Sequence, residues 1–178
     1  MSENAEDGRE IRPWGEAHAR LSRIFALDSH LPANPFRHSF GHKAYFHWDY
    51  FLNRDFSGVL KTFADRVGDR YIDLVGVGES RNSRTLHSRA DSINVASMTP
   101  DSYWGALMNP VEDNYCAATS AAISGKYPNW ACWADNSWEL VIFGSELGLP
   151  TLELFGVPYY TNISDALTLI EPLSAGLS

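Results

Sequence analysis

The chain has 178 residues, which fits one domain able to bury about 70% of the surface of its unfolded form. It carries 22 acidic and 14 basic side chains, a formal net charge of −8 at pH 7. This balance argues against nucleic acid and anionic membranes as partners, because both need Lys and Arg contacts, and it suits a basic protein partner. With only two cysteines, Cys116 and Cys132, we expect neither a Cys-rich zinc site nor a disulfide framework.

The first part of the chain is polar and acidic. Residues 1–12 predict a disordered tail, followed by a single domain over residues 13–178. The tail lacks the apolar stretch of a secretory signal, and no apolar run approaches the roughly 18 residues of a membrane span. We therefore expect a cytoplasmic protein.

The first predicted elements are helices. Residues 13–26 place apolar side chains at helical spacing. A clearer helix is predicted over residues 54–67, because Asn53 can cap its beginning and Gly68 suits a left-handed stop.

Two later helices have recognisable beginnings. One opens at Thr99, which supplies a capping oxygen, with Pro100 in the first helical position. The other covers residues 163–170, where Thr161 or Asn162 can act as the cap.

Strands are predicted between these helices. Residues 71–76 are apolar on both faces, which indicates a central strand. Two strands flank the turn-forming sequence Asp135-Asn-Ser137. Further candidate strands are residues 83–88, 92–98 and 152–160. This order of elements favours an α+β fold with a mainly antiparallel sheet, an aromatic hairpin and three to four packing helices.

The aromatic hairpin contains three tryptophans within nine residues. Strand alternation places Trp130 and Cys132 on one face and Trp133 on the other. In the return strand Trp138, Leu140 and Ile142 share a face, and if that face pairs with the Trp130 face an aromatic cluster results. Each buried tryptophan would remove about 150–250 Å² from water, so we interpret the hairpin as core. The alternative is a platform of exposed rings in a carbohydrate-binding or small-ligand-binding module.

Together with Tyr103-Trp104-Gly-Ala-Leu107, the hairpin resembles a pattern found in small, poorly characterised bacterial proteins. In that pattern a Tyr-Trp helix precedes a strand ending Trp-Ala-x-Trp-Gly, a charged tip, and a return strand that begins with an aromatic residue and Glu. Some of these proteins resemble the immunity proteins of polymorphic toxins, which bind and neutralise a co-encoded toxin. The match covers about a quarter of the chain, and Ala134 stands where the pattern has glycine. It implies protein binding and specifies no catalytic residue.

A histidine cluster is the best candidate for a metal site. His38 and His42 are four residues apart, with His47 and Asp49 downstream, and a metal-dependent hydrolase using His38, His42 and His47 is an alternative function. The His-Glu-x-x-His motif of metalloproteases is not present, because Ser39 occupies the position of the glutamate.

Other catalytic motifs are incomplete. The sequence Gly76-Val-Gly78 lacks the third glycine of a dinucleotide fingerprint, and Ser80 does not lie in a Gly-x-Ser-x-Gly motif. We therefore predict neither a cofactor nor a catalytic residue, and favour a protein that is not an enzyme.

The acidic balance and the resemblance together predict an immunity-type inhibitor that occludes a basic surface on a protein partner, such as a co-encoded toxin. Five acidic residues near the hairpin and the preceding helix are the candidate contacts. They are Asp101, Glu112, Asp135, Glu139 and Glu146.

Overall fold

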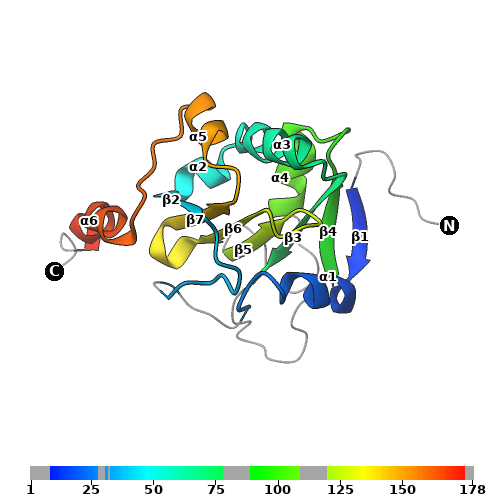
Figure 1. Ribbon diagram of the computed structural model, residues 1–178, viewed down its shortest axis with the longest axis horizontal. Coiled ribbons are helices and arrows are strands. Elements are labelled where there is room, and N and C mark those ends of the chain that lie inside the picture. Colours follow the sequence, from blue (N-terminus) through cyan, green and yellow to red (C-terminus); the bar gives the residue numbers. More distant parts are fainter. Residues whose placement is uncertain (1–8, 28–30, 32, 78–88, 109–119, 175–178) are drawn as a thin grey trace.

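A computed structural model describes residues 9–27, 31, 33–77, 89–108 and 120–174. Seven strands form one sheet in the order β1-β4-β3-β5-β6-β7-β2, with every neighbouring pair antiparallel (Figure 1). The strands are β1 (Arg9–Pro13), β2 (His42–His47), β3 (Tyr71–Gly76), β4 (Arg89–Asn94), β5 (Ser120–Ser124), β6 (Trp130–Asp135) and β7 (Leu140–Ser145).

Helices cover both faces of this sheet. Within the described residues they are α1 (Trp14–Leu21), α2 (Trp48–Leu52), α3 (Phe56–Val67), α4 (Pro100–Met108), α5 (Pro150–Leu154) and α6 (Ile163–Ser174), with a short 3₁₀ helix η1 (Asn136–Trp138). Two of the six, α2 and α5, are only five residues long. The predicted α+β class with an antiparallel sheet is confirmed.

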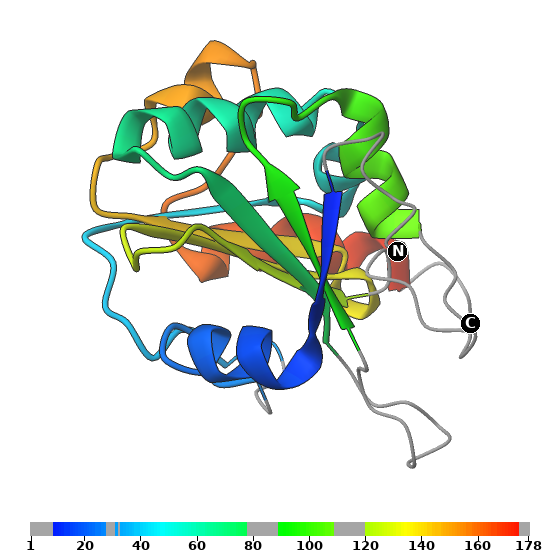
Figure 2. The same cartoon turned by 90° about the vertical axis from the view of Figure 1, so that its right-hand side faces the viewer.

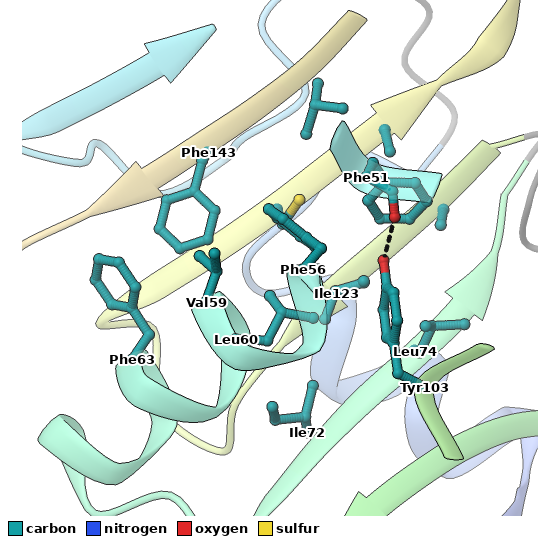
Figure 3. Close-up of a cluster of buried hydrophobic side chains, with 14 of the residues drawn as sticks. Phe51, Phe56, Val59, Leu60, Phe63, Ile72, Leu74, Tyr103, Ile123 and Phe143 are labelled. Atoms are coloured by element: carbon teal, nitrogen blue, oxygen red, sulfur yellow. Dashed lines mark hydrogen bonds between the residues drawn. The ribbon is translucent and has the colours of Figure 1, made fainter. Parts of the chain in front are cut away.

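The larger core lies between the sheet and helices α2 to α5 (Figure 2). The apolar stripe of α3, which includes Phe56, Leu60 and Phe63, is buried against the strands (Figure 3). The hydroxyl of Tyr103 donates a 2.7 Å hydrogen bond to the carbonyl oxygen of Phe51 and so joins α4 to α2. Burial raises the pKa of Tyr103 well above its usual value, so this hydroxyl keeps its proton and remains a donor.

The second core lies on the opposite face. It is covered by α1, by the apolar side chains that follow α1 up to Phe40, and by α6 through Ala166. Trp133 belongs to this face, where its ring centroid lies 5.8 Å from that of Phe25.

Most helix ends follow the sequence signals, but the predicted cap Asn53 does not begin α3, which starts at Phe56 with Asp55 in the N-cap position. Gly68 ends α3 with φ of 74°, in the left-handed region that glycine adopts without a steric penalty. The Thr99 hydroxyl accepts a 3.1 Å hydrogen bond from the Ser102 amide, and Asn162 accepts one of 2.9 Å from the Asp165 amide, so each caps the helix that follows.

The strand predictions were less accurate. Residues 71–76 form β3, which is central as expected, whereas residues 83–88 lie outside the described residues. The predicted strand over residues 152–160 is wrong, because Pro150 begins helix α5. Only Tyr160 of this segment makes a bridge to β2. Strand β1 (Arg9–Pro13) includes residues 9–12 of the segment predicted to be a disordered tail.

The tryptophan hairpin is core on both sides of the sheet. Trp130 and Cys132 share one face and Trp133 takes the other, as alternation predicts. Trp138 lies in η1 rather than in the return strand, and it packs with Leu140 and Ile142 on the second core instead of the Trp130 face. The return strand therefore places Phe143 on the Trp130 face, where the two rings stack with centroids 5.9 Å apart.

Among the described residues, no helix has the length and apolar character needed to cross a membrane.

Candidate functional site

Two carboxylates flank β7. Glu139 immediately precedes this strand and Glu146 immediately follows it, so they lie roughly 20 Å apart along the strand. The backbone fixes both ends: the Glu139 carbonyl accepts a 3.0 Å hydrogen bond from the Trp48 amide, and the Glu146 amide donates one of 2.9 Å to Asn129. Glu139 has φ of 47° and is the sole non-glycine residue with positive φ in the described part of the chain. Both acidic residues are at least partly exposed.

Glu139 lies beside a histidine with a structural role. His47 Nδ1 accepts a 3.2 Å hydrogen bond from the Asp49 amide and so caps α2. In a neutral imidazole the proton therefore resides on Nε2, which lies 3.4 Å from a carboxylate oxygen of Glu139. His47 therefore has a structural role: it caps α2, and its other ring nitrogen faces Glu139.

Glu146 pairs with a second histidine. His38 Nε2 lies 2.8 Å from Glu146 Oε1, and the His38 ring meets Phe40 edge-on with centroids 4.7 Å apart. A Cβ atom at Gly41 would stand 3.4 Å from the other Glu146 carboxylate oxygen. The segment before β2 therefore holds the Glu146 side chain close to the sheet edge.

The predicted histidine cluster is dispersed. His42 and His47 stand at the two ends of β2, roughly 17 Å apart and on opposite faces of the sheet, and His38 is engaged with Glu146. In the part of the chain that the structure describes, no three His, Cys, Asp or Glu side chains are close enough to hold a metal ion. The arrangement gives the metal-dependent alternative no support.

The other candidate contacts do not join Glu139 and Glu146. Asp135 is buried, and its carboxylate accepts hydrogen bonds of 2.9 and 2.6 Å from the amide and hydroxyl of Ser137, which close the turn of η1. Asp101 is exposed on α4, where it pairs with Arg54. Asp101 belongs to the first turn of α4, a helix that contacts β3 and β4 rather than β7. Glu112 lies outside the described residues.

Sequence reasoning missed two further exposed acids. Glu153 lies in α5, where it accepts a 2.9 Å hydrogen bond from the Tyr159 hydroxyl, an interaction that raises the pKa of Tyr159. Asp165 lies in the first turn of α6.

The signal that could have found these acids is the distribution of charge. All 14 Lys and Arg residues, and all six His, lie within residues 1–126, whereas residues 127–178 contain six acidic side chains and no basic one. These last 52 residues supply β6, β7, α5 and α6. The net negative charge is therefore concentrated in one part of the fold.

A buried polar row on the α1 face was also missed. Arg20 of α1 forms an ion pair with Asp73 in the centre of β3. Ser92 and Ser124 stand directly opposite Asp73 on the two neighbouring strands, and both serines are fully buried. Their hydroxyls have no hydrogen-bond partner among the described residues. Because fully buried hydroxyls cannot reach a substrate, we assign this row a structural role.

In the comparisons with known proteins, no family model, no curated protein and no solved structure matches this chain.

Proposed function

We propose that this protein is an immunity-type inhibitor that binds a basic protein, such as a co-encoded toxin, and occludes its functional surface. The observation that carries the proposal is the absence of any basic residue from residues 127–178. A surface of one sign attracts a partner of the opposite sign over a distance of about one Debye length, roughly 8–10 Å. Such attraction raises the rate of encounter and excludes partners of the same sign.

Three at least partly exposed acids of this region each have a side-chain partner that favours one orientation. Glu146 is held by His38, Glu153 by Tyr159, and Glu139 faces the imidazole of His47. Carboxylates that are already oriented lose less side-chain entropy when a partner binds. A pre-organised acidic surface supports occlusion of a basic cleft.

The carbohydrate-binding alternative has less support. It needs at least two exposed tryptophan rings in register, whereas Trp130 and Trp133 are buried on opposite faces of the sheet. Trp138 is partly buried beside the second core.

The proposal is tested by co-purifying the protein with the product of the neighbouring gene. The Glu139→Lys/Glu146→Lys variant reverses two charges in the proposed surface, and Glu16→Lys/Asp65→Lys makes the same change in net charge at exposed sites on α1 and α3. We expect the first variant to slow association by about tenfold or more at low salt, and the control to change it far less. Failure of the wild-type protein to bind the gene product at micromolar concentration would refute the proposal.

A further inference from the structure

Exposed apolar side chains concentrate next to the acidic region. Among the described residues, six large apolar side chains are exposed, and three of them, Leu147, Leu154 and Phe155, lie within nine residues of each other. Leu154 at the end of α5 is 73% exposed, the highest value of the six. Single exposed apolar residues are ordinary on protein surfaces, but a group rimmed by polar residues is typical of an interaction site.

The exposure of Leu154 follows from the shortness of α5. Leu152 is fully buried and directs the helix onto the main core. Residues two apart on a helix point about 200° away from each other, so Leu154 faces solvent. The chain then turns at Gly156, with φ of 65°, and Val157 returns to the core.

Phe155 is held in place by α3. A Cβ atom added at Gly58 would lie only 2.6 Å from a ring carbon of Phe155, so the ring rests directly on the backbone of that glycine. The ring is nevertheless 43% exposed. An aromatic side chain that is fixed on one side and open on the other is a pre-organised anchor, because little conformational entropy remains to be lost on binding.

The charge around these residues identifies the occupant. Glu146 directly precedes Leu147 and Glu153 directly precedes Leu154, so two of the three apolar residues have an acidic neighbour in the chain. The basic residues near Gly58 are engaged elsewhere, because Arg54 pairs with Asp101 and Lys61 donates a hydrogen bond to the Val95 carbonyl oxygen. An apolar centre with an acidic rim is complementary to an apolar side chain flanked by Lys or Arg. A second copy of the same face would bring the carboxylates together, which like-charge repulsion disfavours.

We infer that Leu147, Leu154 and Phe155 form a docking surface, here called the α5 surface, for a basic amphipathic segment of a partner protein. This inference rests on the proposed function, since it names the part of the acidic region where the partner is anchored. The apolar contacts supply most of the binding energy at the centre, and the carboxylates select a basic partner and speed the encounter.

The first test uses a defined probe, a synthetic Leu/Lys amphipathic peptide about four helical turns long, with a control peptide in which serine replaces every leucine. We expect the wild-type protein to bind the Leu/Lys peptide at least about tenfold more tightly than the control peptide, with amide chemical-shift changes centred on α5. Equal affinity for the two peptides, or no binding at micromolar concentration, would overturn the inference.

Matched variants localise the effect. Leu154→Ser removes the most exposed anchor and should weaken binding of the Leu/Lys peptide by about tenfold. Met108→Ser removes a side chain exposed to 41%, close to the value for Phe155, from the end of α4, and should leave affinity unchanged. Equal losses in the two variants would refute the α5 surface. A wild-type dimer that Leu154→Ser converts to a monomer would show that the occupant is a second copy and would overturn the assignment.

The inference and the proposed function can fail separately. If the neighbouring gene product binds in a charge-dependent way but Leu154→Ser has no effect on its affinity, the inference is wrong and the proposed function stands. If no gene product binds while the peptide still requires Leu154, the immunity function is wrong and the α5 surface remains.

Discussion

The indole Nε1 of Trp130 donates a 3.0 Å hydrogen bond to the carboxylate of Asp69, and the same carboxylate accepts a 2.9 Å hydrogen bond from the Lys126 amide. Asp69 follows the stop of α3, whereas Trp130 begins β6. The carboxylate packs against Gly125 so closely that a Cβ atom there would lie 1.8 Å from Asp69 Oδ2. One buried acid therefore joins the end of α3 to the turn between β5 and β6.

Replacing Asp69 should destabilise the protein strongly. Asp69→Ala leaves the donors of Trp130 and Lys126 without this acceptor, and each buried unsatisfied donor costs about 1–3 kcal/mol. We expect the free energy of unfolding, measured by urea titration with tryptophan fluorescence, to fall by about 2–4 kcal/mol. Asp65→Ala changes an exposed aspartate of α3 and should stay within about 0.5 kcal/mol of wild type. A loss no larger than that of this control would contradict the assigned role.

Asp69 also predicts a pH dependence. Burial raises the pKa of this carboxyl above its usual range, and the hydrogen bonds from Trp130 and Lys126 only partly oppose the shift. The unfolded chain therefore loses the proton first as pH rises. The stabilisation from protonated Asp69 is complete below the unfolded pKa and is lost as pH rises through the higher folded pKa. The unfolding free energy of wild type relative to Asp69→Asn should fall as pH rises above the ordinary aspartate range, and an increase would show that the pKa is lowered.

Local signals were enough to predict several elements. The α3 stripe with its glycine stop and the apolar strand β3 depend on neighbouring residues only, so their patterns are visible in the sequence. The partner of Asp73 was not predictable, because Arg20 meets it only after α1 packs across the sheet. Helix α5 was missed because its five residues contain too few positions to establish a helical period. The predicted acidic contacts show the same difference. Glu139 and Glu146 are at least partly exposed because they lie in turns, which the sequence indicates. The position of Asp135 depends on its hydrogen bonds to Ser137, which the sequence does not show.

The buried serines next to Asp73 make a contrasting prediction. Ser124 is fully buried and its hydroxyl has no partner among the described residues, so Ser124→Ala removes an unsatisfied polar group. We expect this variant to be neutral or to gain up to about 1 kcal/mol of stability. Ser102 is equally well buried, but its hydroxyl donates a 2.9 Å hydrogen bond to the Thr99 carbonyl, so Ser102→Ala should lose about 1 kcal/mol. Thermal unfolding of the two variants distinguishes them, and a larger loss for Ser124→Ala would show that its hydroxyl is satisfied.

The left-handed backbone at Glu139 links stability to the proposed binding. A non-glycine residue in this region costs roughly 1 kcal/mol, and φ of 47° places Glu139 within it. Glu139→Gly should therefore raise the free energy of unfolding by about 0.5–1 kcal/mol while slowing association with a basic partner. Glu139→Gln removes the same charge without relieving the backbone, so it should slow association and leave stability nearly unchanged. If Gly and Gln have the same stability, strain at this turn is not significant.

The contact between Gly58 and Phe155 can be tested by a double-mutant cycle. A glycine inside a helix such as α3 usually gains about 0.5–1 kcal/mol on replacement by alanine. At position 58 the new methyl group would meet the Phe155 ring at 2.6 Å, and the ring must move to admit it. Gly58→Ala should therefore give little or no stabilisation in the wild-type chain and should weaken the anchor of the α5 surface. In the Phe155→Ala background the ring is absent, and the same substitution should stabilise the protein by about 0.5–1 kcal/mol.

The free energy of unfolding of these variants is measured by urea titration. Equal effects of Gly58→Ala in the two backgrounds would mean that Phe155 does not rest on α3 in solution and that the anchor is not pre-organised.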